Sequence, residues 1–167
     1  PVTLNGLITR DYSVPTNPPA NSFVVRTASG GTPPYRYTAE NPAIVNINET
    51  TGKVISLESG STNIIVTDQA ERTAQYSVTC SNIQLLFNMG FKMEYSTAVQ
   101  IATGYGGRIP SVSEFNTARD TSSTRIISWC WTSDASGLRQ IALIPSTGQQ
   151  EVRDKNTATY AWGIKAN

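Results

Sequence analysis

The stretch from Ser29 to Val78 constrains the fold most, because short strand patterns alternate there with turn signals. Runs of β-branched and aromatic residues are separated by clusters of Gly, Pro, Asn, Asp and Ser. The turn signals recur about every eight to twelve residues, and short strands at that spacing are typical of a β-sandwich. We expect strands at 23–27, 35–38, 44–47, 53–57, 63–67 and 73–80.

The N-terminal segment has a less regular pattern. Val2 to Thr9 fits a strand, but Pro15, Pro18 and Pro19 follow it. Proline removes a backbone donor and fixes φ, so we expect residues 13–21 to form a loop or an edge segment.

Residues 81–167 predict helices as well as strands. Four residues recur at the i, i+3, i+4, i+7 spacing of one helix face: Tyr95, Ala98, Val99 and Ala102. Gly104 suits the end of that helix. Ser111 and Glu114 have the spacing of a capping box, which predicts a second helix ending near Arg119. Strands are expected at 83–87, 125–132, 138–144, 149–153 and 159–165.

The change of pattern near residue 80 predicts two domains, which 167 residues are enough to build. We place the first, a β-sandwich with an irregular N-terminal segment, at residues 1–80. The second, with helices and strands, is placed at 81–167. The fold class is therefore mostly β with a small α+β part. Because the chain begins at Pro1 without Met, we expect a fragment or a processed form.

Charge and composition disfavour several function classes. The chain has 13 basic and 12 acidic side chains, and neither half is basic enough to suggest nucleic-acid binding. It contains no histidine, which removes the commonest general base and zinc ligand. We therefore expect no catalytic residues, no metal site and no cofactor, and we predict that the protein is not an enzyme.

The two cysteines, Cys80 and Cys130, leave two alternatives open. In an oxidising compartment they can form a disulfide. It would close the loop between Cys80 and Cys130, and on the chain-entropy account a loop of that length stabilises a fold by about 4 kcal/mol. Alternatively both are buried thiols, since cysteine is often an apolar core residue. A nucleophilic role for Cys130 is disfavoured because no histidine is available as its base.

Several motifs resemble the C-terminal region of intimin- and invasin-type bacterial adhesins. Residues 29–35, 41–47, 51–54, 59–68 and 73–79 occur in the order seen in their Ig-like repeats, and residues 106–111, 129–133 and 160–165 resemble their terminal C-type-lectin-like domain. The resemblance implies an Ig-like β-sandwich followed by a C-type-lectin-like domain. The calcium-binding motifs of sugar-binding C-type lectins are missing, so we expect no calcium-dependent sugar binding.

The resemblance implies a non-enzymatic protein-binding module of an extracellular adhesin, secreted or exposed on the bacterial outer membrane, whose C-terminal domain binds a host-cell receptor. One alternative is a secreted exoprotein that assembles with other Ig-like proteins of an intimin-like export system. Another is a phage or pilus tip protein. Loops carry binding on such scaffolds, and we predict these contact residues: Tyr105, Arg108, Arg139, Arg153 and Lys155.

Overall fold

The chain divides into two units in the computed structural model, which describes residues 1–10, 14–121, 128–136 and 138–167. The first unit comprises Pro1–Leu7, Pro18–Ile83 and Asn167, and the second comprises Ile8–Asn17 and Gln84–Ala166. Strands β1 (Val2–Arg10) and β7 (Thr73–Met93) contribute residues to both units. That each of the predicted halves, 1–80 and 81–167, folds alone stays a prediction.

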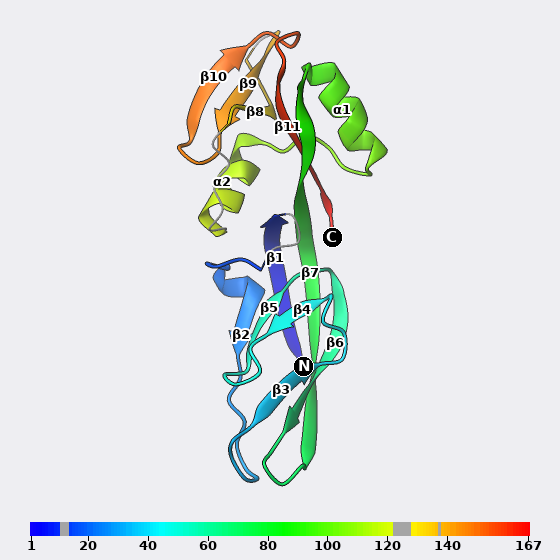
Figure 1. Ribbon diagram of the computed structural model, residues 1–167, viewed down its shortest axis with the longest axis vertical. Coiled ribbons are helices and arrows are strands. Elements are labelled where there is room, and N and C mark those ends of the chain that lie inside the picture. Colours follow the sequence, from blue (N-terminus) through cyan, green and yellow to red (C-terminus); the bar gives the residue numbers. More distant parts are fainter. Residues whose placement is uncertain (11–13, 122–127, 137) are drawn as a thin grey trace. The chain divides into compact units, whose positions relative to one another are not determined.

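The first unit is built from two sheets whose neighbouring strands are antiparallel, except that β1 runs parallel to β7 (Figure 1). One has the order β2 (Phe23–Val25), β5 (Lys53–Ser56), β4 (Val45–Ile47). The other has the order β3 (Arg36–Ala39), β6 (Gly60–Thr67), β7, and β1 also pairs with β7. A short 3₁₀ helix, η1 (Ala20–Ser22), precedes β2.

Alternation along these strands explains the core of the first unit. Thr62 and Ile64 on β6 are buried, as are Val78 and Cys80 on β7, because every second side chain of a strand points to the same face. The buried residues of this core come from both sheets and from β1: Leu4, Leu7, Tyr37, Val45, Val54, Ile64, Val78, Cys80 and Ile83.

The predicted turn between β4 and β5 is confirmed, and Gly52 is required in it. The Asn48 side chain accepts hydrogen bonds from the backbone of Thr50 (3.1 Å) and Thr51 (2.8 Å). Gly52 has φ 68°, and a Cβ there would collide with the carbonyl oxygen of Arg26. A residue with a side chain would be strained at this position.

The second unit contains one sheet with the order β10, β9, β8, β11, β7. Its strands are β8 (Cys130–Ser136), β9 (Arg139–Ile144), β10 (Gln149–Arg153), β11 (Thr159–Ala166) and the later residues of β7. β8 runs parallel to β11, and the other neighbours are antiparallel. Its helices are α1 (Tyr95–Gly104) and α2 (Val112–Thr121).

Each helix covers its own face of this sheet (Figure 1). Phe115 of α2 packs in one core with Cys130, and Ala98 of α1 packs in a second core with Trp131. Cys130 and Trp131 are consecutive on β8, so their side chains point to opposite faces. Of the helices in the described part of the chain, none combines the length and the apolar character needed to cross a membrane.

The predicted mostly-β fold class with two helices is confirmed, and most predicted elements occur close to their expected bounds. Two differ. The strands expected at 73–80 and 83–87 are one strand, β7, which continues to Met93. The strand expected at 125–132 is described only from Cys130 onward, and residues 125–127 lie outside the described residues.

Candidate protein-binding surface

Three cationic side chains lie over aromatic rings at one end of the sheet in the second unit. Lys92 Nζ is 5.3 Å from the centre of the Tyr160 ring, and Arg153 Cζ is 4.7 Å from that of Trp129. Lys155 Nζ is 5.9 Å from the centre of the Tyr95 ring. These six residues form what we call the cation–aromatic cluster. Strand register explains part of it, because Tyr160 of β11 pairs directly with Lys92 of β7.

Arg153 is the most firmly held cation of the cluster. Its guanidinium forms an ion pair with Glu151 (Nη2 to Oε2, 3.0 Å) and donates to Thr159 Oγ1 (3.3 Å). The side chain is 19% exposed, so it is largely withdrawn from water. Cation–π contacts strengthen as they are desolvated, so Arg153 and Trp129 stabilise each other's position.

A cavity of ≈ 280 Å³ opens at this cluster. It is lined by Lys92, Trp129, Arg153 and Tyr160, with Ser128, Ala158 and Thr159 completing the wall. The volume is at the lower limit of small-molecule sites, so it suits one side chain of a protein partner better than a whole ligand. Trp, Tyr and Arg are the residue types that contribute most energy in protein–protein contacts.

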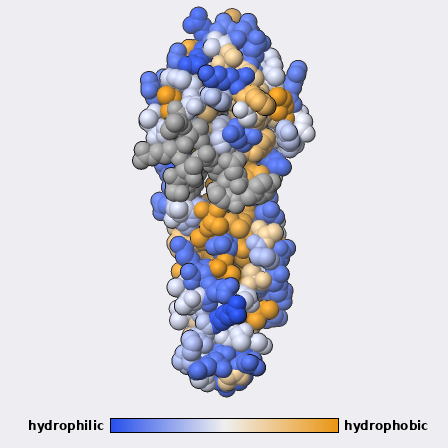
Figure 2. Space-filling view, viewed as in Figure 1, coloured by the Kyte–Doolittle hydropathy of each residue, from blue (hydrophilic) through white to orange (hydrophobic). Residues whose placement is uncertain are grey.

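The surrounding surface is mostly polar. On the visible face of the second unit, Figure 2 shows hydrophilic side chains with hydrophobic ones scattered among them. The large apolar side chains that are exposed include Phe91 at 75% and Leu138 at 93%. Scattered apolar residues of this kind are normal on a protein surface, so the cation–aromatic cluster is the more distinctive feature.

The structure separates the five predicted contact residues into different places. Arg153 and Lys155 belong to the cation–aromatic cluster. Arg139 begins β9 and is exposed, but it lies one residue before Gln140, the register partner of Arg153. Successive residues alternate between faces, so Arg139 points to the opposite side of the sheet from Arg153.

Tyr105 and Arg108 lie near the other end of β11. Tyr105 is 64% exposed and contacts Phe87 edge-on, with ring centres 5.7 Å apart. Arg108 makes two backbone hydrogen bonds with Ile164 of β11. The five residues therefore form no single patch, and their role as contacts stays a prediction.

Arg108 is engaged with α2. Its guanidinium donates to both carboxylate oxygens of Glu114, and Glu114 accepts from the backbone N–H of Ser111 (2.8 Å). Glu114 N–H in turn donates to Ser111 Oγ (3.2 Å), so the predicted capping box is confirmed. The hydrogen bond from Arg108, followed by the bond from Ser111, lowers the pKa of Glu114, although burial opposes this.

The contact residues predicted from the sequence do not include four members of the cluster, namely Lys92, Tyr95, Trp129 and Tyr160. The sequence pattern predicts that the strand before Lys92 ends at Phe87, whereas β7 continues to Met93. The helical spacing places Tyr95 on the apolar helix face, and its ring packs edge-on against the buried Trp131 (5.6 Å between ring centres). The length of β7 was the signal that could have placed Lys92 beside Tyr160.

The structure contains Cys80 and Cys130 as buried thiols, which is the second of the two alternatives. Cys80 packs among the core residues of the first unit, and Cys130 packs in a core of the second. The disulfide between them is therefore not formed in this structure. Burial raises the pKa of Cys80 to about 11, so its thiolate is scarce at neutral pH.

Within the described ranges, no three or more Cys, Asp or Glu side chains gather where they could hold a metal ion. Two acidic residues of the second unit are instead engaged with backbone groups. Asp134 accepts the backbone N–H of Val112 at 2.6 Å, and Asp154 accepts that of Asn156 at 3.0 Å. The absence of calcium binding stays a prediction that thermal stability can test.

The chain is similar to intimins. It is 34% identical over 84 residues to the intimin of Escherichia coli O127:H6, a match that covers 50% of this chain and 9% of that protein. It is 31% identical over 84 residues to the intimin of Hafnia alvei, covering 50% of this chain and 30% of that protein. The chain thus spans less than a third of the length of these relatives. No protein-family model matches the chain.

A solved structure is similar over a larger share of the chain. It is the C-terminal 282-residue fragment of intimin in complex with the translocated intimin receptor (Tir) intimin-binding domain. The TM-score is 0.61 at 25% identity, covering 86% of this chain and 56% of that chain. The resemblance to the C-terminal region of intimin/invasin-type adhesins is confirmed, as is an Ig-like β-sandwich followed by a C-type-lectin-like domain.

Proposed function

We propose that this chain is a non-enzymatic protein-binding module of a bacterial adhesin that is exposed on the cell surface or secreted. The second unit binds a receptor on a host cell, and the first unit acts as a spacer. One observation carries this proposal, namely the similarity to an intimin fragment that was solved bound to a receptor domain. A function transferred by fold needs support from the site itself.

The cation–aromatic cluster supplies that support. Trp129, Tyr160 and Arg153 line one cavity, and they are residue types that protein interfaces favour. Lys92 and Lys155 add positive charge beside it. Rim charges of one sign steer a partner of the opposite sign and speed association. The expected partner surface is therefore acidic, with a side chain that fits beside Trp129.

Binding to the Tir intimin-binding domain and to cultured host cells tests this function. The chain and three single variants would be titrated onto both: Arg153→Gln, Trp129→Ala and Arg36→Gln. Arg36 is the matched control, since it is an exposed, ion-paired arginine of the first unit (3.0 Å to Glu49). We expect Arg153→Gln and Trp129→Ala to weaken binding about tenfold or more, as loss of an anchor does.

Equal binding by all three variants would place the receptor contact elsewhere on the chain. If the chain binds neither the Tir domain nor any host cell, the receptor-binding function is wrong. Circular dichroism of each variant separates lost contacts from lost folding, because Trp129 also supports Arg153 within the second unit.

A specific observation also favours the alternative of a secreted exoprotein that assembles with other Ig-like proteins. β10 is an outer strand of its sheet, and Gln149–Val152 are exposed. Such an edge can accept a strand from a partner by β-augmentation. However, the Glu151–Arg153 ion pair places charges on it, and charged edges resist pairing. Retention of Ig-like proteins from the producing bacterium, lost in Val152→Pro, would support this alternative.

A further inference from the structure

The first unit contains a cavity of ≈ 760 Å³ that its role as a spacer does not use. The segment from Val25 to Gly31 forms one wall, and residues of β3, β6 and β7 form the rest together with Tyr35, Asp68 and Arg72 from the loops between them. Small-molecule sites typically measure about 300–1,000 Å³, so the cavity has the size of a ligand site. It lies wholly within the first unit, so any role it has is independent of receptor binding by the second.

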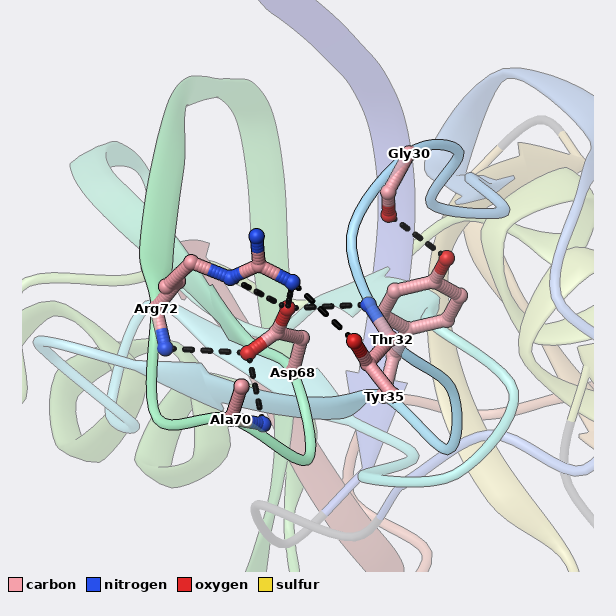
Figure 3. A network of polar contacts seen from close by, with 6 residues as sticks. All are labelled: Gly30, Thr32, Tyr35, Asp68, Ala70 and Arg72. Carbon is pink, nitrogen blue, oxygen red and sulfur yellow. Dashed lines mark hydrogen bonds and ion pairs between the residues drawn. The ribbon is translucent and has the colours of Figure 1, made fainter.

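Hydrogen bonds fix the glycine-rich loop that borders this cavity (Figure 3). Asp68 Oδ2 accepts the backbone N–H of Thr32 at 2.9 Å and the Arg72 guanidinium at 2.7 Å. The Tyr35 hydroxyl donates to the Gly30 carbonyl at 2.7 Å. The loop is thus anchored on both sides of Gly31. Because this wall is already ordered, a ligand would not have to order it on binding.

One positive charge in the wall has no acidic partner. Arg72 is neutralised by its ion pair with Asp68. Arg26 instead lies over the Tyr76 ring, 4.9 Å from its centre, and forms no ion pair within the part of the chain that the structure describes. An arginine held on an aromatic face presents its N–H groups in a fixed plane, a geometry that suits a carboxylate.

Tyrosines supply ring surface and a hydroxyl group that lacks a partner. Tyr35 and Tyr76 are half-buried and line the cavity. The Tyr76 hydroxyl is buried and finds no hydrogen-bond partner among the described residues. Most buried polar groups in native proteins have a partner, and a ligand acceptor that reaches this hydroxyl would supply one. Burial also raises the pKa of Tyr76, which keeps it a donor at neutral pH.

We propose that this cavity binds a small carboxylate that carries a ring, with Arg26 pairing the carboxylate. The Tyr35 and Tyr76 rings contact the ring of the ligand, and the Tyr76 hydroxyl donates to one of its oxygens. Both an acidic sugar and an aromatic acid have this chemistry. The positive charge disfavours cationic ligands, and neutral analogues lack the pairing with Arg26.

The test uses the whole chain and four probes in two matched pairs. D-Glucuronate is compared with D-glucose, and 4-hydroxybenzoate with 4-hydroxybenzamide, by amide chemical-shift titration. We expect at least one acid to bind about tenfold tighter than its neutral partner, with shifts at Arg26 and Tyr76. The acid that binds tells whether the ligand is a sugar or an aromatic compound.

Three variants localise the effect. Arg26→Gln should remove the preference for the acid over its neutral partner. Tyr76→Phe should weaken binding of the acid, because the variant lacks the hydroxyl group but retains the aromatic ring. Lys53→Gln is the matched control, because Lys53 lies over Phe23 (4.8 Å to the ring centre) in the same unit and is not part of the cavity lining. Binding of neither acid, or an unchanged preference in a folded Arg26→Gln variant, would overturn the proposal.

Discussion

Arg108 donates to both carboxylate oxygens of Glu114, with Nη1 2.8 Å from Oε2 and Nη2 2.5 Å from Oε1. The pair joins the segment after α1 to the first turn of α2, where Glu114 also caps the helix by accepting from Ser111. An acidic side chain in that turn also interacts favourably with the helix dipole and so stabilises the helix. The predicted contact residue Arg108 is thus engaged in holding α2 in place, although its side chain remains 55% exposed.

Removing the cap should destabilise the second unit. In Ser111→Ala, the backbone N–H of Glu114 loses its acceptor, so we expect the free energy of unfolding to fall by about 1 kcal/mol. Urea unfolding followed by tryptophan fluorescence measures this, because all three tryptophans lie in residues 129–162. Ser113→Ala, two residues along and exposed, is the control and should change little. Equal losses in both variants would argue against a capping role.

Stability should fall in acid. The backbone hydrogen bond from Thr32, followed by the bonds from Arg72, lowers the pKa of Asp68 from 3.8 to about 2, although burial opposes this. The pKa of Glu114 is likewise lowered from its usual 4.5. A lowered folded-state pKa stabilises the fold above the unfolded-state value, and this contribution is lost as pH falls through the folded-state value. The urea concentration at the midpoint of unfolding should therefore be constant above pH 4.5 and should fall as the pH is lowered toward 2.

Asp68→Asn isolates the part of this decline that Asp68 causes. The variant should be less stable than the parent at neutral pH and should show a shallower decline in acid, since the group that titrates is gone. Glu94→Gln is the control, because Glu94 is exposed and its side chain forms no cap hydrogen bond with α1. A parent-like acid profile in Asp68→Asn would show that other carboxylates dominate.

The cysteines should react only after unfolding. Both thiols are buried, and burial raises the pKa of Cys80 to about 11. We expect little reaction of the folded chain with a thiol reagent, and two thiols per chain when it is unfolded without reductant. The unfolded Cys80→Ala variant should give one thiol per chain. No thiol in the unfolded, unreduced parent would instead show that a Cys80–Cys130 disulfide exists in solution.

Gly163 should not tolerate a side chain. It pairs with Phe87 across β11 and β7, and a Cβ at Gly163 would overlap the Phe87 ring. Gly163→Ala should therefore displace that ring from Tyr105 and lower the free energy of unfolding by about 1–3 kcal/mol, as overpacking does. Gly104→Ala is the control, since a Cβ there meets nothing within 4 Å. Calorimetry of both variants makes the comparison.

We propose that residues 1–80 and 81–167 each fold on their own. Each fragment should unfold cooperatively, but the second should be weakened because Ile8, which packs with Leu86 and Phe115, is missing from it. Ile8→Ala in the whole chain should accordingly destabilise the second unit by about 2–5 kcal/mol and affect the first less. If neither fragment shows a cooperative transition, the boundary is wrong.

Local patterns were sufficient for most of the elements. The spacing of Ser111 and Glu114 predicted the capping box. The predicted apolar face of α1 is buried at Ala98 and Ala102, whereas Val99 on the same face is 38% exposed. The turn at Asn48–Gly52 followed from its residue types alone. In each case the interacting groups are at most four residues apart, so the chain needs no distant partner to favour the structure.

The candidate surface and the cavity depended on tertiary structure. Lys92 meets Tyr160 only because β7 continues past Phe87 and pairs with β11 in one register, with a shift between Tyr160 and Trp162. Arg26 lies over Tyr76 only because segments far apart in the sequence face each other. By itself, the sequence determined the periodic faces, the caps and the turns of this protein. Packing between distant segments decided which charges meet which rings, because register and burial depend on contacts that no local spacing encodes.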